Sequence, residues 1–429
     1  IQNHNNEKEV RMRKLSVLVI GLLFVFGFAI NAYATNGMNM ISYGGTASGM
    51  AGASLGISDD PSAMNNNPAG LTYVKTGEAG AGISLLMPNL THKDFANDKE
   101  GESAIFPLPM MAYAHRVGKG PLVLGLGVFA QGGMGAEFTD LNTAFGTKDT
   151  TYSNVMYAKI TPTVAYQVSD KVSLGLALNV GYSALEFKFF PETSYGMTFS
   201  GMDLKDASSF GYGAKLGVMI KPSDMVSLGI VYTSESKLDP GDGDLTLNMS
   251  SLGLGKVKYD ADIEGFTWPQ QLGFGVGIRP NKKLLIGVDL TWVNWSDAMD
   301  VMTVKASNPD NAMAPASMDI PFKMKWEDQW VFALGAAYKA TDSLTVRAGY
   351  NYGKNPIPAE TLSPLFPAIV EHHLTVGLGY TFGIWRIDGA WEYALNKEVT
   401  YTNPDAPFGT NAVEEHNQNT IHLFATYTF

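Results

Sequence analysis

The sequence contains no cysteine among its 429 residues, which excludes a disulfide framework and thiolate chemistry. It is also poor in charge, because Asp, Glu, Lys and Arg make up only 17% of the residues, against the usual quarter. The net charge of −11 argues against a nucleic-acid partner, since nucleic-acid binding needs a basic face. Beyond Ile30 no stretch approaches 18 consecutive apolar residues, so we expect no transmembrane helix there.

The N-terminal region has the organisation of a secretory signal. Arg13-Lys14 precedes an apolar run, and Ala32-Tyr33-Ala34 forms a small-residue cleavage site. We therefore predict a signal peptide over residues 12–34, with Thr35 as the first residue after cleavage. An uncleaved membrane helix is the alternative, but the apolar run is short for a ~20-residue span. Residues 1–11 are polar and are interpreted as an upstream extension.

Alternation with a period of two dominates the rest of the chain. In residues 344–353, the apolar or aromatic residues Leu, Val, Ala, Tyr and Tyr alternate with Thr, Arg, Gly, Asn and Gly, and residues 172–180 and 374–382 follow the same pattern. Such a strand separates two environments. In a soluble sandwich its apolar face would meet a core, whereas in a membrane barrel it meets lipid and the small polar face lines the lumen.

The lengths of the connections distinguish these two architectures. Short connections at 118–121, 169–171, 221–224, 280–283, 340–342 and 383–384 alternate with long polar ones at 90–104, 133–152, 190–207, 237–266, 297–326, 354–370 and 399–417. Short turns at one end and long loops at the other are typical of outer-membrane barrels. We therefore predict an all-β protein, in which residues 77–429 form a transmembrane antiparallel barrel of about 14 strands.

Aromatic residues near the expected strand ends fit the interfacial girdles of such a barrel, although aromatic residues favour strands in general. The residues assigned to the girdles are Tyr166, Tyr182, Tyr232, Trp292, Trp295, Trp330, Tyr338, Trp385 and Tyr393. The final strand ends at Phe429 after an apolar alternation. This ending resembles the assembly signal of outer-membrane barrels, which implies the barrel-assembly machinery as a partner.

A barrel of this size needs a plug, because about 14 strands enclose a lumen wide enough to leak. The glycine-rich segment 35–76 precedes the first strand and is predicted to fold into the lumen, with a disordered tail as the alternative. Near its end lies Asn67-Pro68-Ala69. Pro68 fixes its own φ angle, and the Asn67 amide can satisfy free backbone groups.

A glycine-rich plug that ends in Asn-Pro-Ala and precedes a barrel resembles the FadL family over residues 35–429. These proteins are outer-membrane transporters of long-chain fatty acids and other hydrophobic compounds in Gram-negative bacteria. The resemblance implies that residues 35–76 are a hatch, that Thr35, Asn36 and Gly37 reach the lumenal ligand site, and that Asn67-Pro68-Ala69 closes the hatch against the wall.

The same resemblance assigns a kink to the third barrel strand. The stretch 129–138 is similar to the region that opens the family's barrels sideways, and Gly132 and Gly133 would let the strand bend. The alternative is the ordinary end of a strand entering a loop. The implied mechanism is capture by extracellular loops, binding inside the barrel, movement of the hatch N-terminus and passive lateral release into the membrane.

Charged residues on the expected lumen face are candidates for ligand binding, because a charge facing lipid would be unfavourable. They are Lys159, Lys215, Asp289, Arg347, Arg386, Asp388 and Glu392. Lys159, Lys215, Arg347 and Arg386 could each bind a fatty-acid carboxylate. The alternative is a network in which these charges pair with one another.

The connection 237–266 combines acidic and apolar residues. Its apolar residues could form a groove that captures substrate, and its acids could bind a divalent ion that bridges lipopolysaccharide. A solvated loop is the default interpretation. Lipopolysaccharide and other outer-membrane lipids are expected partners in any case.

Signals for an enzyme, a cofactor or a metal are weak. Gly52-Ala53-Ser54-Leu55-Gly56 fits G-x-S-x-G, but that motif needs a strand before it and a helix after it. His372 and His373 begin an expected strand, so their side chains point to opposite faces and cannot share one metal ion. We expect a transporter without cofactors. The alternatives are an aromatic-hydrocarbon channel, a non-transporting adhesin or structural barrel, and a lipid-acting enzyme through Ser54.

Overall fold

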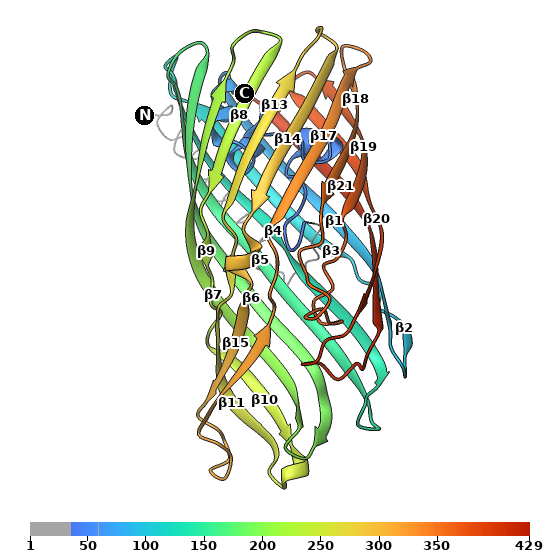
Figure 1. The fold of residues 1–429 in the computed structure, drawn as a ribbon. Helices are drawn as coiled ribbons and strands as arrows, with labels where there is room; N and C mark the ends of the chain where they lie inside the picture. The colour runs from blue at the N-terminus through green and yellow to red at the C-terminus, as the bar shows by residue number, and fades with distance from the viewer. Residues whose placement is uncertain (1–35, 59) are drawn as a thin grey trace, which may run out of the picture.

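The computed structural model describes residues 36–58 and 60–429, and the predicted extension 1–11, signal peptide 12–34 and Thr35 lie outside this range. Fourteen strands close into one antiparallel barrel, which confirms the predicted fold class (Figure 1). In order around the barrel they are β1 (Gly77–Lys93), β3 (Phe106–Arg116), β4 (Leu122–Asn142), β5 (Lys148–Gln167), β6 (Val172–Tyr195), β7 (Phe199–Ile220), β8 (Val226–Thr233), β13 (Gln271–Ile278), β14 (Leu284–Val293), β17 (Gln329–Lys339), β18 (Leu344–Gly353), β19 (His372–Phe382), β20 (Trp385–Tyr401) and β21 (Ala412–Thr428). Pairing of β21 with β1 closes the ring.

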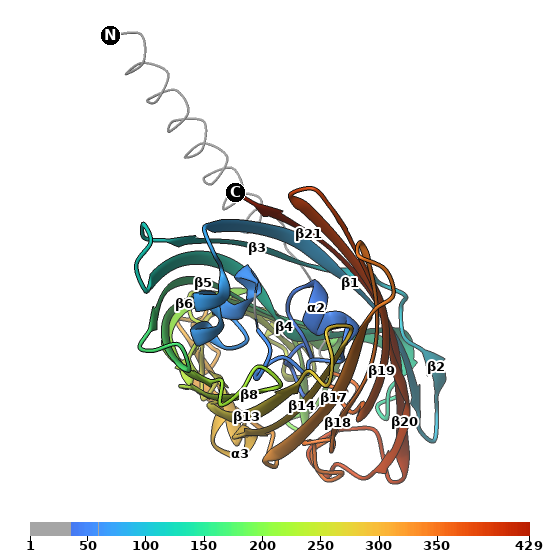
Figure 2. The same ribbon diagram turned by 90° about the horizontal axis from the view of Figure 1, so that it is seen from above.

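The helical segments are all short. They are α2 (Gly45–Gly49), the 3-10 helices η1 (Pro61–Met64), η2 (Pro68–Tyr73) and η3 (Ser250–Leu252), and α3 (Trp295–Ala298). No helix within residues 36–58 and 60–429 is long and apolar enough to cross a membrane. Seen along the barrel axis, α2, η1 and η2 lie inside the ring of strands (Figure 2).

The outer surface of the barrel carries the predicted apolar face. On β19, Leu374, Val376 and Leu378 are each about half exposed, whereas the intervening His373 and Thr375 are buried. Alternate residues of a strand point to opposite faces, so the large apolar side chains face outward and the small or polar ones face inward. A band of this kind meets lipid in an outer-membrane barrel.

The strands β4 to β7 are longer than predicted, and the segments 133–152 and 190–207 that we expected to be loops are mostly strand. The expected loops 237–266 and 297–326 are likewise corrected, because they form hairpins. The hairpin strands are β10 (Gly243–Met249) with β11 (Gly255–Glu264), and β15 (Val301–Ser307) with β16 (Ser317–Lys323). The other short strands are β2 (Asp98–Glu100), β9 (Ser236–Lys237) and β12 (Thr267–Trp268).

The hairpins extend the barrel wall beyond the membrane band. β10 pairs with the far end of β7, β11 pairs with β10 and β15, and β16 pairs with β15 (Figure 1). On β10 the inward residues Leu245, Leu247 and Met249 are buried. Their apolar burial explains why this acidic segment folds as a sheet instead of a solvated loop.

Trp295 is a further correction, because it does not lie in an outer girdle. It begins α3, whose N-cap residue Asn294 accepts a hydrogen bond from the Asp297 amide. The short helix turns Trp295 into the interior, where it is fully buried and packs edge-on against Trp268 and Trp326.

The connection 354–370 folds into the barrel interior. Leu362, Leu365 and Ile369 are almost completely buried in the main apolar cluster. His416 Nδ1 lies 3.0 Å from the carbonyl oxygen of Pro367, and Ser153 donates to the Leu365 carbonyl. This connection therefore narrows the lumen toward the end with the long loops.

Candidate ligand path through the barrel

The predicted hatch fills the end of the lumen near the short turns. Asn67 is fully buried and its side chain accepts a hydrogen bond from the Ala69 amide, which caps η2. Its Nδ2 donates to the carbonyl oxygens of Leu55 in the hatch, at 2.8 Å, and Val218 in β7, at 3.2 Å. The Asn67 side chain thus joins two hatch segments to the barrel wall.

The wall carries glycine where the Asn67-Pro68-Ala69 segment approaches it. A Cβ atom on Gly217 would lie 2.2 Å from Asn67 Oδ1, and one on Gly175 would lie 2.3 Å from the Ala69 nitrogen. A Cβ on Gly229 would lie 1.9 Å from the Leu55 carbonyl oxygen. No larger residue fits at these positions without moving the hatch.

Polar side chains of the wall bind the hatch backbone. Asp289 Oδ2 accepts hydrogen bonds from the amides of Ser54, at 2.6 Å, and Leu55, at 2.8 Å. Asn351 donates to the Ala51 carbonyl and Thr375 donates to the Gly49 carbonyl, both at 3.1 Å. These bonds satisfy a backbone that has little regular secondary structure of its own.

Arg347 and Arg386 are occupied by protein carboxylates. Arg347 Nη1 donates to Asp388 Oδ1 at 2.8 Å, and Arg386 Nε donates to Asp388 Oδ2 at 2.8 Å. Arg386 Nη2 also donates to Asp60 Oδ2 in the hatch at 2.7 Å. These two arginines, predicted as candidates for binding a ligand carboxylate, form a paired network that holds the hatch instead.

The first described residues of the hatch form a ladder with the predicted kink in β4. Met40 N donates to the Gln131 carbonyl at 3.3 Å, and Gly133 N donates to the Met38 carbonyl at 3.1 Å. The β4–β5 register shifts between Ala130 and Gly132, and Gly132 has a φ of +140°. A Cβ there would lie 2.2 Å from the Met38 oxygen, so the close approach requires glycine.

At the same level, the pairing of β4 with β3 ends. The β3–β4 pairing runs only from Arg116↔Val123 to Met110↔Phe129, although β4 continues to Asn142. Pro107 and Pro109 of β3 have no N–H with which to continue the ladder. The hatch residues Met38 to Met40 thus hydrogen-bond to β4 where its pairing with β3 has ended.

Asn36 and Gly37 lie beside this ladder. Asn36 and Asn39 exchange backbone hydrogen bonds, and Trp268 Nε1 donates to Asn39 Oδ1 at 2.8 Å. Gly37 has a φ of +64°, and a Cβ there would lie 2.7 Å from the Trp295 ring. The structure therefore brings the predicted residues Asn36, Gly37, Gly132 and Gly133 to one place in the interior.

Lys159 and Lys215 line a small polar cavity beside the ladder. The cavity measures about 60 Å³ and is also lined by Met40, Tyr43 and Gln131. Lys215 Nζ donates to the Asn65 carbonyl. Within residues 36–58 and 60–429, the buried amino group of Lys159 has no hydrogen-bond or ion-pair partner. Lys159 pairs in strand register with Phe129 at the start of the kink.

A larger apolar cavity of about 410 Å³ lies near the end with the long loops. It is lined by residues of the β6–β7 hairpin, of β10 and β16, and of the inward-folded connection 354–370, among them Phe189, Phe199, Met249, Ile320 and Phe366. Its volume falls in the range of ligand pockets for small organic molecules. Aromatic pairs such as Phe187–Phe322, with centroids 5.3 Å apart, pack beside it.

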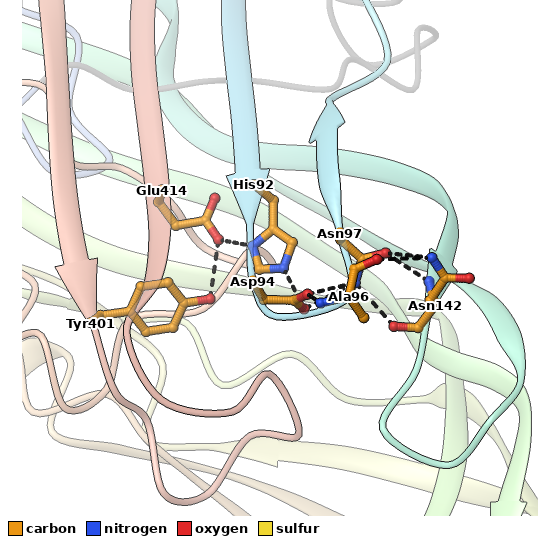
Figure 3. A network of polar contacts seen from close by, with 7 residues as sticks. All are labelled: His92, Asp94, Ala96, Asn97, Asn142, Tyr401 and Glu414. Atoms are coloured by element: carbon orange, nitrogen blue, oxygen red, sulfur yellow. Dashed lines mark hydrogen bonds and ion pairs between the residues drawn. The ribbon is translucent and has the colours of Figure 1, made fainter.

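A buried polar network joins β1 to β20 and β21 near the long-loop ends of these strands, beyond the lipid-facing band (Figure 3). The outward residues at this level are polar, among them Asn89 on β1 and Asn417 on β21. His92 Nδ1 lies 2.5 Å from Glu414 Oε1, and His92 Nε2 lies 3.2 Å from Asp94 Oδ2. Burial alone would lower the pKa of His92, but the two carboxylates raise it to about 9.

The enzyme and metal alternatives find no matching geometry. Ser54 lies in a turn of the hatch, without the strand and helix that a nucleophile elbow needs. His373 is buried, whereas His372 on the other face lies 2.7 Å from the Tyr350 hydroxyl. Residues 36–58 and 60–429 hold no group of three or more His, Asp or Glu side chains arranged to bind a metal ion.

Sequence reasoning missed the aromatic residues that surround the hatch N-terminus. Trp268 was not singled out, and Trp295 was assigned to the outer girdle. Met38 and Tyr43, which is hydrogen-bonded to the Gln131 carbonyl at 2.6 Å, were read only as part of a glycine-rich segment. A tryptophan followed by proline at Trp268-Pro269 is the one local signal against an ordinary lipid-facing strand position.

This architecture defines a plugged, 14-stranded barrel of the outer membrane. A family model described as "Outer membrane protein transport protein (OMPP1/FadL/TodX)" matches residues 27–429, and the chain belongs to this family of channels for hydrophobic compounds. It is therefore a multi-pass barrel of a Gram-negative outer membrane, in a family of transporters and not of enzymes.

Individual relatives agree with this assignment. The chain is 24% identical to outer membrane protein P1 of Haemophilus influenzae, over 96% of this chain and 95% of that protein. Its fold is similar to that of the toluene transporter TodX of Pseudomonas putida, with a TM-score of 0.76 and 20% identity over 91% of this chain and 99% of the other. A Pseudomonas aeruginosa FadL homologue matches with a TM-score of 0.75 and 19% identity, over 92% and 100% of the two chains.

Proposed function

We propose that the protein carries acidic hydrophobic molecules, such as long-chain fatty acids, by passive diffusion from the extracellular cavity to the gap between β3 and β4. The observation that carries this proposal is the buried amino group of Lys159, which has no carboxylate partner within the described residues. Burial without a partner disfavours the protonated form of a lysine, and an anionic ligand head would stabilise that form. The acyl chain would gain about 0.8 kcal/mol for each CH₂ buried against the apolar wall.

The path starts at the 410 Å³ cavity, which is lined mainly by aromatic and other apolar side chains. The charged residues in this lining, Lys323 and Asp405, form an ion pair with each other at 3.0 Å. The large apolar cluster continues inward from this cavity to Met38 and Met40 of the hatch. Withdrawal of residues 36–40 from β4 would then open the gap to the membrane. The described residues contain no nucleotide-binding motif, and a concentration gradient would drive the flow.

Substitution of Lys159 by methionine tests the carboxylate site. We expect the affinity of the detergent-solubilised protein for oleate to fall about tenfold, which corresponds to the loss of one charge-assisted hydrogen bond. Binding of toluene, which has no charge, should not change. Lys148→Gln is the matched control, because Lys148 is exposed at the start of β5. Equal oleate affinity in the Lys159 variant and the wild type would refute the carboxylate site.

An aromatic hydrocarbon is the second candidate cargo. The named relatives include toluene transporters, and the extracellular cavity is lined by Phe189, Phe199 and Phe366. Tight binding of toluene together with no detectable binding of oleate would favour this cargo. Failure to bind either compound would favour the non-transporting alternative.

A reversible cross-link tests the lateral gate. Met40 and Gln131 occupy opposed positions of the hatch–β4 ladder and line the same small cavity. Because the natural sequence has no cysteine, Met40→Cys with Gln131→Cys would form the one disulfide of the chain. Uptake should stop in the oxidised variant and return on reduction, while Met40→Cys alone stays active. Unchanged uptake by the oxidised protein would exclude hatch withdrawal as the gating step.

Two further partners are part of the proposal. Phe429 closes the seam, with its amide donating to the Gly77 carbonyl at 2.8 Å, and half of its side chain is exposed for recognition by the barrel-assembly machinery. The acidic outer surface of the β10–β11 hairpin would contact lipopolysaccharide through divalent ions. Deletion of Phe429 should lower the amount of folded barrel in the outer membrane, whereas Phe429→Tyr should not.

A further inference from the structure

The short-turn end of the barrel carries a charge opposite to that of the whole chain. We define the periplasmic rim as residues 74–78, 116–121, 168–171, 221–225, 279–283, 339–343 and 383–384, which are the short connections and their flanking residues. The rim contains nine basic and four acidic side chains, although acidic residues outnumber basic ones by 41 to 30 in the full sequence. Short turns face the periplasm in outer-membrane barrels.

Six of these basic side chains have no hydrogen-bond or ion-pair partner among the described residues. They are Lys75, Lys119, Lys171, Arg279, Lys282 and Lys283. All but Arg279, which is half-buried, are exposed. The remaining rim cations are engaged elsewhere, since Arg116 binds hatch carbonyls, Lys221 lies over the Tyr73 ring and Lys339 pairs with Asp342.

The unpaired cations lie along a long arc of the rim that runs from β1 to β14 and covers nine of the fourteen strands. Lys75 lies between η2 and β1, Lys119 lies in the β3–β4 turn and Lys171 lies in the β5–β6 turn. The β13–β14 turn holds the other three, Arg279, Lys282 and Lys283. On the shorter remaining arc, the β17–β18 turn holds the Lys339–Asp342 pair and the β19–β20 turn is the uncharged Gly383-Ile384. The unpaired rim cations are therefore confined to the arc from β1 to β14.

The arc lies next to the membrane interface. Tyr113 and Tyr166 are exposed on the outer face just before the turns that carry Lys119 and Lys171. Exposed aromatic residues at strand ends mark the headgroup level of a barrel. Lysine side chains placed just beyond that level can extend their ammonium groups to lipid phosphates.

We propose that this basic arc is a binding site for anionic phospholipids, such as phosphatidylglycerol, in the periplasmic leaflet of the outer membrane. The occupant is a lipid and not an acidic periplasmic protein, because the cations follow the curved edge of the barrel beside exposed aromatic side chains. Attraction between basic side chains and anionic headgroups is local and is screened within a Debye length. The site would fix the depth of the barrel in the membrane along this arc, which includes the β3–β4 gap.

The test measures lipid selectivity of the full protein in nanodiscs by native mass spectrometry. Phosphatidylglycerol and phosphatidylcholine are supplied in equal amounts, and retained lipids are counted on the ejected protein. We expect the wild type to retain phosphatidylglycerol preferentially. Lys171→Gln, Lys282→Gln and Lys283→Gln together should lower that preference at least fivefold, since each rim lysine contributes to the attraction.

The matched control removes three other exposed lysines without described partners, Lys148→Gln, Lys237→Gln and Lys258→Gln, from the extracellular extension. It should keep the wild-type preference. Should the rim variant not fold, a salt titration of the wild type decides, because high salt should abolish the selectivity. A wild type without preference at low salt, or an equal loss in both triple variants, would overturn the proposal.

Discussion

The two halves of the lumen are packed by different means. The periplasmic half is filled by the hatch backbone, which lies against wall glycines such as Gly217 and Gly229. The hatch is held by hydrogen bonds that its Ser54 amide and Asn67 side chain donate to Asp289 and to the Val218 carbonyl of the wall. The extracellular half is filled by large apolar and aromatic side chains around a cavity of about 410 Å³. A directional, hydrogen-bonded seal and an adaptable apolar chamber serve different purposes, and substitutions should affect them differently.

The largest effect is expected where the wall must lack a side chain. In Gly229→Val the new Cβ would lie 1.9 Å from the Leu55 carbonyl oxygen, so the hatch must move away from β8. We expect ion conductance through single proteins in planar bilayers to rise by about an order of magnitude, because an unplugged barrel of this size leaves a water channel.

Gly389→Val is the matched control for that substitution. Atoms nearest to a Cβ at Gly389 lie 3.8 Å away, so this position tolerates a side chain. Its conductance should stay at the wild-type level. A sealed Gly229→Val barrel would show that the glycine wall does not set the fit of the hatch.

The next effect concerns the ionic part of the seal. Asp388→Asn leaves Arg347 and Arg386 without their shared carboxylate, and removal of one partner from a buried pair costs about 3–5 kcal/mol. The urea midpoint for loss of the folded barrel should therefore fall. Asp405→Asn removes a carboxylate from the exposed Lys323–Asp405 pair and should have little effect. Equal midpoints for the two variants would contradict the assignment of the seal to Asp388.

In the extracellular half, substitutions of two methionines can distinguish the buried lining of the 410 Å³ cavity from its exposed edge. Met249 and Met197 both line the cavity, but Met249 is 4% exposed and Met197 is 93% exposed. A buried lysine side chain is unfavourable beside an uncharged ligand, so Met249→Lys should weaken the binding of toluene about tenfold, whereas Met197→Lys should not. Neither variant should change conductance. Increased leakage in Met249→Lys would mean that the two halves are not independent.

The smallest effect is expected from pH. His92 has a raised pKa of about 9, so its charged form stabilises the network fully below pH 6.5, and this contribution is lost as the pH rises through 9. The ring of Phe408 packs 5.0 Å from that of His92. Hydrogen exchange of residues 402–411 should therefore speed up between pH 7 and 10, after correction for intrinsic rates, and His92→Gln should remove this dependence. An unchanged profile in the variant would exclude His92 as its origin.

Local sequence patterns were sufficient to predict the barrel fold. Alternation in segments such as 172–180 and 374–382, and the sorting of connections by length, depend only on neighbouring residues and on the two solvents that a strand meets. The same reasoning failed for 237–266, because its aspartates suggested a loop while the alternation of Leu245, Leu247 and Met249 already indicated a strand.

The candidate site could be predicted only in part. Asn36, Gly37, Gly132 and Gly133 were identified through the family resemblance, but the hydrogen bonds that bring their segments together, Met40 to Gln131 and Gly133 to Met38, join residues more than 90 positions apart. Whether a lumenal arginine is free or paired depends on which hatch and wall residues face it, and no local pattern encodes that. Arg347 and Arg386 were therefore indistinguishable from Lys159 in the sequence.

The long reach of the hatch contacts has a consequence for biogenesis. Hydrogen bonds that hold the hatch join residues far apart in sequence, for example Tyr43 and Gln131, 88 positions apart, and Asp60 and Arg386, 326 positions apart. Contacts between such distant residues form late, because the intervening chain must be ordered first. The hatch, which precedes the barrel strands in the sequence, is thus expected to reach its final structure after them, and an assembly intermediate would be an open, conducting ring.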